Sequence, residues 1–460
     1  MYTLSRNMKL SSIILMVIGF LGLAYAFFTV PANTDEVKEM MVNVGEHGSA
    51  ESASEGHAAE GHQEETHESN IIDKAQGDPG FTAGHEGGAE AAHHGDEHWE
   101  HVMHQMQNRP LSATFVAAFF FFMIALGALV FYAIQYASQA GWSPVLYRVM
   151  EGITGYLLPG SIALFLILMF AGEHFYIWMD EELVANDEIM QIKAGYLNFP
   201  FWVIRIIIYL TGWNLYRYFS RRNSLRQAEV SNIVPYRKNY KISIYFLIFF
   251  IITEAFMAWD FFMSLTPHWY STLFPWYVFA SLFVTAITTI ALVVIFLKKA
   301  GHLEFVNDSH LHDLGEYIFA FSIFWTYLWF AQFMLIWYAN IPEEVTYFII
   351  RIQEYNILFF GMLVLNFVFP VLMLMNVDFK RVPWFVVLTG IAVLVGHYID
   401  VYLLIMPPTV GPNWFFGIPE IAALCFFLGL FIFIVGTELG KVSLYPKGDP
   451  FIKESENHHY

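Results

Sequence analysis

Ten long apolar segments constrain the fold of this 460-residue sequence more than any other feature. A helix needs about 20 apolar residues to cross the roughly 30 Å hydrocarbon core of a bilayer. Because every backbone polar group must be bonded internally at that depth, such segments fold as helices. They lie at about 10–30, 111–136, 153–172, 196–219, 241–263, 273–297, 313–338, 347–375, 383–405 and 415–436. We predict an all-α polytopic membrane protein with ten transmembrane helices.

Composition supports this class and excludes others. The chain is 57% hydrophobic and 14% charged, which is more apolar surface than one soluble core of this size can bury. Its net charge of −18 argues against a nucleic-acid partner. The single cysteine, Cys425, excludes a disulfide framework, a thiolate zinc site, an iron–sulfur cluster and covalently attached haem within this chain.

The first segment admits two interpretations, a signal peptide and a membrane anchor. Basic residues precede it, and the letters AYA at 24–26 form the small-residue pattern of a cleavage site. The apolar run nevertheless continues with bulky side chains up to Pro31. We therefore predict a retained transmembrane anchor over residues 1–30.

Basic residues fall on alternate connections between the segments. They are Arg6, Lys9, Arg221, Arg222, Arg226, Arg237, Lys238, Lys241, Lys298, Lys299, Lys380, Arg381, Lys441, Lys447 and Lys453. With ten spans, all of them lie on one side, which the positive-inside rule assigns to the cytoplasm. We predict that both termini are cytoplasmic, the C-terminal one as a tail over 441–460.

The connection at 31–110 is rich in Glu, Gly, Ala and His and poor in aliphatic residues, so it cannot fold alone. The topology places it on the outer, periplasmic side. Its histidines invite a metal-binding hypothesis, but they do not form two facing pairs at helical spacing. We favour a mobile, acidic, His-rich loop. The histidines are His47, His57, His62, His67, His85, His93, His94, His98, His101 and His104.

Ionisable residues inside the spans are costly in a bilayer, so each is a candidate functional group. Arg205 and Glu254 lie at similar depth on antiparallel spans, and mutual neutralisation and a functional role both stay open for this pair. His397 and Asp400 are three residues apart and share a helix face. The other outer-side candidates are Glu173, His174, Asp260, Glu354 and Glu420.

A second polar cluster lies towards the inner surface. It consists of His310, His312, Asp313, Glu316 and Glu438, for which helix capping or a place at the membrane interface is the favoured interpretation. Two polar layers around an apolar middle are typical of a proton half-channel, of a quinone pocket at one interface and of a transporter. Histidines do not occur as facing pairs at matched depth, so we expect no haem in this chain.

Several strings resemble the NrfD-type (polysulfide-reductase) membrane anchors of alternative complex III. They are WDFFMSL at 259–265 with PHWYST at 267–272, HLHDLG at 310–315, and QFMLIWYANIPEE at 332–344. Together they place the resemblance over about 110–440. The long His-rich outer loop and the ten spans are more similar to the ActF-type anchor than to the ActC-type anchor.

The resemblance implies an NrfD-like membrane domain over 111–440. Two four-helix bundles would lie at about 111–263 and 273–405. Two peripheral helices would lie beside the bundles, and 415–436 is the second of these. The implied complex is a quinol:cytochrome c (or quinol:oxidase) oxidoreductase of a bacterial inner membrane. Its other subunits would be a paralogous NrfD-like anchor, an iron–sulfur subunit and c-type cytochrome subunits, with a terminal oxidase as a further partner and phospholipids around it. Haem c and iron–sulfur clusters would belong to the partner subunits only.

The resemblance also implies that quinol is oxidised near the outer surface. Glu173, His174 and Asp260 are then the candidate quinone-binding or proton-accepting residues. The candidate proton path consists of Arg205, Glu254, His397, Asp400, Glu420, His312, Asp313 and Glu316. We predict a non-redox subunit, not catalytic by itself, that supplies a scaffold, a quinone site and a proton path. An ion-coupled secondary transporter and a metal transporter stay open as alternatives.

Overall fold

A computed structural model describes residues 2–31, 33–38, 89–412 and 414–459, and within these ranges the chain contains helices and loops but no strand. The long helices are α1 (Arg6–Phe28), α4 (Ala89–Ala137), α6 (Leu157–Phe175), α9 (Phe199–Gln227), α10 (Val234–Phe261), α11 (Phe274–Lys299), α12 (Asp308–Ala339), α17 (Pro383–Val410) and α18 (Ile418–Gly440). The shorter ones are α5 (Tyr147–Ile153), α7 (Glu181–Asn186), α8 (Glu188–Lys193), α13 (Pro342–Gln353), α14 (Asn356–Leu363), α15 (Phe369–Leu374), α16 (Val377–Arg381) and α19 (Ile452–Glu456).

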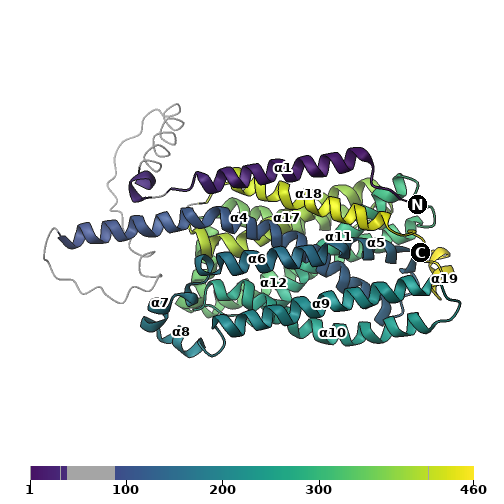
Figure 1. Ribbon diagram of the computed structural model, residues 1–460, viewed down its shortest axis with the longest axis horizontal. Coiled ribbons are helices and arrows are strands. Elements are labelled where there is room, and N and C mark those ends of the chain that lie inside the picture. Colours follow the sequence, from purple (N-terminus) through teal and green to yellow (C-terminus); the bar gives the residue numbers. More distant parts are fainter. Residues whose placement is uncertain (1, 32, 39–88, 413, 460) are drawn as a thin grey trace.

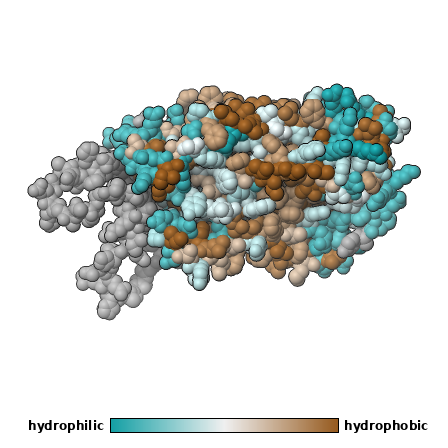
Figure 2. Space-filling view, turned by 90° about the horizontal axis from the view of Figure 1, so that it is seen from below, coloured by the Kyte–Doolittle hydropathy of each residue, from teal (hydrophilic) through white to brown (hydrophobic). Residues whose placement is uncertain are grey.

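The chain is an all-α, multi-pass membrane protein. Among the described residues, nine helical segments are long and apolar enough to cross a bilayer. Figure 2 shows hydrophobic residues around the middle of the molecule and hydrophilic residues at its two ends. The predicted fourth span corresponds to α9, which is not among these nine segments. Arg205, Asn214 and several Trp and Tyr residues reduce the mean hydropathy of this helix. It nevertheless lies antiparallel along α10 (Figure 1).

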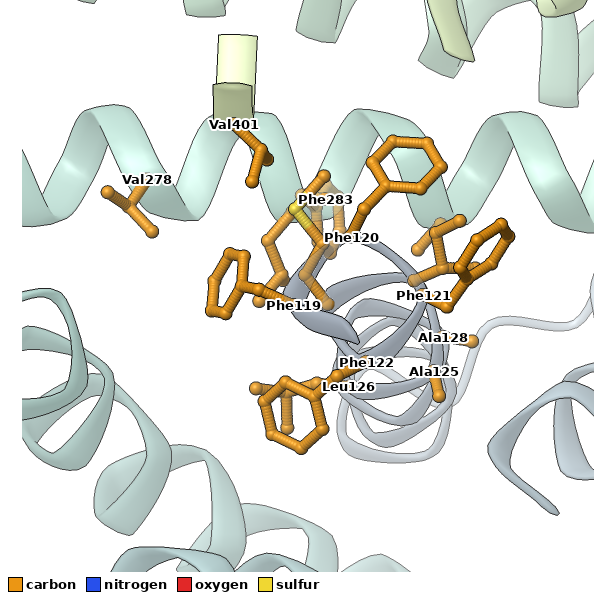
Figure 3. Packing of buried hydrophobic residues seen from close by; sticks show 14 of the residues in the cluster. Phe119, Phe120, Phe121, Phe122, Ala125, Leu126, Ala128, Val278, Phe283 and Val401 are labelled. Carbon is orange, nitrogen blue, oxygen red and sulfur yellow. The ribbon is translucent and has the colours of Figure 1, made fainter. Parts of the chain in front are cut away.

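Helix α4 occupies the centre of the molecule. Its four consecutive phenylalanines, Phe119 to Phe122, are all buried. Successive helical residues point about 100° apart, so each ring meets a different neighbour. Phe119 lies 4.7 Å from Phe262 at the end of α10, Phe120 lies 5.2 Å from a tyrosine of α17, and Phe121 lies 5.4 Å from a phenylalanine of α18, measured between ring centroids. The run therefore faces other helices on every side, as Figure 3 illustrates.

Two predicted elements have different bounds in the structure. Helix α4 begins at Ala89, so it extends well into the segment predicted as a loop to residue 110. The eighth segment, predicted at 347–375, is divided: α13 is a separate amphipathic helix, and the apolar span is Asn356–Leu374. The chain turns between α13 and α14, so the apolar run does not continue as one straight helix. Most of the predicted His-rich loop, residues 39–88, lies outside the described residues.

Helix α1 is attached along α18 through small residues. An added Cβ at Gly19 would lie 2.4 Å from the backbone nitrogen of Phe426, and one at Gly429 would lie 2.6 Å from the carbonyl oxygen of Ser12. These glycines therefore permit close backbone contact, which is a common basis of helix association in lipid. The opposite face of α1 is exposed and apolar, as expected for a peripheral membrane helix.

The two chain ends lie at the same end of the molecule, and α7 and α8 lie at the other (Figure 1). Alkaline phosphatase, which is active only outside the cytoplasm, should therefore be active when fused near residue 190 and inactive when fused near residue 230. The physical reason is the basic charge around 221–241. The opposite pattern of enzyme activity would reverse the predicted orientation.

Candidate functional site

Asp400 of α17 is the centre of a buried polar cluster in the second half of the chain. It is 1% exposed and accepts three hydrogen bonds from two neighbouring helices. The Tyr277 hydroxyl of α11 donates to its Oδ1. The Ser281 hydroxyl and the Trp325 indole nitrogen donate to its Oδ2 over 2.9 and 3.1 Å. Each of the three donors replaces a hydrogen bond that this buried carboxyl group would otherwise make to water.

His397 lies one helical turn before Asp400 and joins the same cluster. Its Nδ1 is 2.9 Å from the Ser281 oxygen and 3.4 Å from Asp400 Oδ2. If the single Ser281 hydrogen is donated to Asp400, the tautomer of His397 that bonds to Ser281 is the one with hydrogen on Nδ1. Its Nε2 is buried without a hydrogen-bond partner in the described part of the chain. His397 therefore presents to the interior of the protein a ring nitrogen without a hydrogen-bond partner among the described residues.

A small cavity lies on the other side of Asp400. Its volume is about 20 Å³, which is enough for one water molecule. Tyr277, Gln332 and Arg351 line it together with Asp400. The buried Arg351 guanidinium donates to the carbonyl oxygens of Leu403 and Tyr347 and lies 3.6 Å above the Tyr347 ring. The side chains of Arg351 and Asp400 thus line one gap that has room for one water molecule.

Four further buried polar residues, on α11, α12, α17 and the segment before α15, have side-chain polar atoms without a partner in the described part of the chain. Hydrogen-bond partners are lacking, within the described residues, for Thr288 of α11, Ser322 of α12, both side-chain polar atoms of Asn366, and Thr389 of α17. All four residues are buried. Asn366 lies in a π-helical turn, Val364–Val368, that joins α14 to α15. Its oxygen would be 2.1 Å from a Cβ added at Gly396, so it lies directly beside the residue that precedes His397.

These four residues occur at intermediate positions along their helices. Ser322 is fourteen residues from the start of α12, or ~21 Å at the rise of a helix, and Thr389 is six residues from the start of α17, or ~9 Å. Buried polar atoms usually find a partner, protein or water. We call the set of Thr288, Ser322, Asn366 and Thr389 the polar lane.

The inner cluster lies beyond the polar lane. Lys380, which is 3% exposed, donates to Glu316 over 2.7 Å. His312 lies 3.6 Å from Glu316 and 3.4 Å from Asp313, and His458 of the C-terminal tail lies 2.8 Å from Asp313. The predicted residues His312, Asp313 and Glu316 are thus brought together. His310 instead serves in a capping box with Asn307, as the capping interpretation predicted.

The first half of the chain has a different buried pair from the predicted one. Arg205 of α9 contacts Asp260, with Nη2 at 2.7 Å from Oδ1 and Nε at 3.1 Å from Oδ2, and Tyr196 also donates to Oδ1. Arg205 does not contact Glu254, whose Oε1 is buried without a partner in the described residues. Glu254 and Asp260 are six residues apart, so their side chains project in directions about 120° apart around α10. The similar depth of Arg205 and Glu254 was therefore insufficient to predict the pair.

The remaining outer-side candidates are distributed over separate places. Glu173 and His174 are exposed at the end of α6, whereas Asp260 is buried against Arg205. Glu420 of α18 is paired with Arg109 at 2.7 Å and also caps its own helix by accepting the Gly417 N–H. The structure therefore does not collect Glu173, His174 and Asp260 in one pocket.

Several buried charged residues were missed as site candidates by sequence reasoning. Arg109 follows a polar stretch, Lys380 lies in a basic connection, and Arg351 appeared to belong to a long apolar segment. A buried ion pair at the inner end, Arg148 with Glu151 at 2.8 Å, was also missed. All of them lie near the ends of apolar segments. At these positions the sequence pattern does not distinguish a charged side chain that faces water from one that faces the protein interior.

Asp449 in the C-terminal tail provides a pH-dependent test of tail docking. Burial raises its pKa from 3.8 to about 6, with the Phe451 N–H and Arg148 acting in the opposite direction. Because the folded-state pKa is above the unfolded value, the stabilising effect of the protonated carboxyl is present below pH 4 and is lost as the pH rises through about 6.

The Asp449→Asn substitution should therefore strengthen tail docking at pH 8 but not at pH 4. The amide keeps an oxygen to accept the Phe451 N–H at 3.0 Å. A shift of this size is equivalent to about 3 kcal/mol, so proteolysis within 441–459 should slow by roughly tenfold or more at pH 8. Equal acceleration or no change at both pH values would contradict the assignment.

Comparisons with known proteins do not add a family. No protein-family model matches the chain, and no curated protein is significantly similar to it. Within the described residues, no three His, Cys, Asp or Glu side chains are arranged to hold a metal ion. The histidines of residues 39–88 lie outside that search.

Proposed function

We propose that this chain is a membrane subunit of a quinol:cytochrome c (or quinol:oxidase) oxidoreductase of the alternative complex III type, similar to an ActF-type anchor. It would have ten spans, α9 included, with two four-helix bundles, and both termini would be in the cytoplasm of a bacterium. Its partners would be a paralogous anchor, iron–sulfur and c-type cytochrome subunits and a terminal oxidase. The resemblance of the strings at 259–272, 310–315 and 332–344 supports this class.

One observation supports a role in proton transfer: on α12 and α17, buried polar groups of the polar lane lie at sequence positions between the Asp400 cluster and the inner cluster of Glu316 and Lys380. Oxidation of a quinol releases two protons with its electrons, and the electrons leave through cofactors that this chain lacks sequence motifs to bind. A carboxylate or a neutral imidazole can accept such protons. Asp400 and His397 are a carboxylate and an imidazole in hydrogen-bond contact through Ser281.

In this proposal His397 accepts a proton at its Nε2, because that atom is buried without a hydrogen-bond partner among the described residues. The resulting imidazolium would be stabilised by Asp400, 3.4 Å from Nδ1. Waters bonded to the polar lane would connect Nε2 with the inner cluster. His312, Asp313 and Glu316 would then form the cytoplasmic mouth.

The candidate quinone site at Glu173, His174 and Asp260 remains a proposal with weaker support. Asp260 is already neutralised by Arg205, and Glu173 and His174 face outward. An outward-facing acid and imidazole fit a site shared with a neighbouring subunit better than a site inside this chain. Scaffold and proton transfer are thus the functions that the described residues support best.

An ion-coupled transporter is the second candidate, and the π-helical turn with the unbonded Asn366 favours it. Interrupted helices with free polar groups commonly mark ion sites. Against it, the cavity beside Asp400 has a volume of about 20 Å³, which holds a water but no organic substrate.

Purification of the chain from its native membrane in mild detergent distinguishes the two candidates. A subunit of the proposed complex should co-migrate with c-type haem proteins, and after separation the chain itself should show no haem absorption band. Migration as a single species without haem proteins would overturn the respiratory assignment.

A further inference from the structure

A second, larger cavity lies where α4, α10 and α11 meet. Its volume is about 280 Å³. Phe250 and Trp259 of α10, and Trp276 and Phe279 of α11, form its aromatic walls. Trp276 is 45% exposed, so the cavity opens between α10 and α11 on the apolar outside of the molecule, which lies in the bilayer. We call it the α10–α11 cleft.

The carboxyl of Glu254 lines this cleft and is the single ionisable side chain among the described residues around it. Glu254 is 4% exposed, and its Oε1 has no hydrogen-bond partner within the described residues. It lies seven residues before the end of α10, or ~10 Å along the helix. A buried carboxyl without a partner costs several kcal/mol in an apolar environment, so a ligand that bonds to it would be favoured.

We propose that the α10–α11 cleft binds a neutral, membrane-soluble molecule with an apolar body and one hydroxyl or carbonyl group, and that Glu254 bonds to this group. A protonated carboxyl donates to a carbonyl, and a carboxylate accepts from a hydroxyl. The aromatic walls bury the apolar body. A phospholipid fits less well, because its acyl chain leaves Oε1 unbonded and its charged head group stays at the surface.

This site is separate from Asp400 and the polar lane, and it goes beyond the proposed function. Quinones and hydroxylated lipids share the required chemistry. Binding to the purified chain does not depend on redox partners. If the chain does not co-migrate with haem proteins but still binds the ligand, only the proposed respiratory function is refuted. If it co-migrates with haem proteins but does not bind the ligand, only the proposed site in the α10–α11 cleft is refuted.

The experiment uses dicyclohexylcarbodiimide on the full chain after exchange into lipid-free detergent. This reagent partitions into apolar sites, where the carboxylic acid O–H adds across one N=C bond and the adduct rearranges to a stable N-acylurea without loss of atoms. Mass spectrometry of the α10 peptide should locate the label on Glu254. A probe present at about ten times its dissociation constant should reduce the labelling rate about tenfold by occupying the site.

Three probes distinguish the sources of the ligand: decyl-benzoquinone, dodecanol and phosphatidylcholine. Protection by the quinone alone assigns a quinone, and protection by the quinone and the alcohol assigns a broader class with hydroxyl or carbonyl groups. Equal protection by phosphatidylcholine would overturn the proposal and leave a groove for acyl chains. Failure to label wild-type Glu254 would overturn it as well.

Matched variants separate filling of the cleft from general effects on α10. Ala255→Trp places a large side chain in the cleft and should abolish both labelling and protection. Ile252→Trp adds the same side chain on the exposed face of α10 and should change neither. Glu254→Gln identifies the labelled atom, because an amide does not form the adduct. Retained labelling of Glu254 in Ala255→Trp would contradict the assigned position.

Discussion

Replacement of Asp400 by Asn is expected to reduce the quinol turnover of the proposed complex by about tenfold to a hundredfold, with a lower proton yield per electron. The amide cannot stabilise a positive charge on His397, which lies 3.4 Å away. The fold should persist, because the amide oxygen can accept from Ser281 and Trp325 while its NH₂ donates to the Tyr277 hydroxyl. Turnover should be measured per assembled complex, counted by its haem content.

The matched control for this substitution is Asp378→Asn. Asp378 is an exposed carboxyl in the short helix α16, so its replacement changes the same charge outside the buried cluster. It should leave turnover and proton yield within experimental error. If Asp400→Asn reduced the amount of complex but not the activity of each complex, Asp400 would be a tie between helices, worth on the order of 1 kcal/mol.

Replacement of Arg205 by Met is expected to destabilise the chain by about 3 to 5 kcal/mol, since it leaves the Asp260 carboxylate buried without its cation. Met keeps the length of the apolar stem, so the main loss is the charge. Unfolding in detergent micelles, followed by circular dichroism against increasing dodecyl sulfate, measures the change. The exposed Arg222→Met serves as the matched control and should have little effect.

The double variant Arg205→Met with Asp260→Asn tests the physical cause. The second substitution removes the uncompensated negative charge, so the double variant should be more stable than Arg205→Met alone. A coupling free energy close to zero in this double-mutant cycle would show that the pair does not act as a unit. Turnover measured on the same variants decides whether the pair also has a functional role.

The candidate site was partly predictable. His397 and Asp400 were expected to share a helix face, and the structure places them in one cluster. Their partners were not predictable, because Tyr277 and Ser281 of α11 resemble ordinary residues of an apolar helix in the sequence. The polar lane was also missed, since single Thr, Ser and Asn residues are common in membrane helices that use them only for packing.

The sequence by itself determined that this is a multi-pass helical membrane protein and where most of its helices lie, because a bilayer leaves a backbone of this apolar character no other way to bond its polar groups. The tertiary structure decided which polar residues meet. Arg205 bonds to Asp260 and not to Glu254. The depth of a residue in the membrane follows from its position in the sequence. The direction of its side chain depends on how its helix is rotated against the neighbouring helices. That rotation is set by packing between segments far apart in the chain, which separated Glu254 in its apolar cleft from Asp400 in its polar cluster.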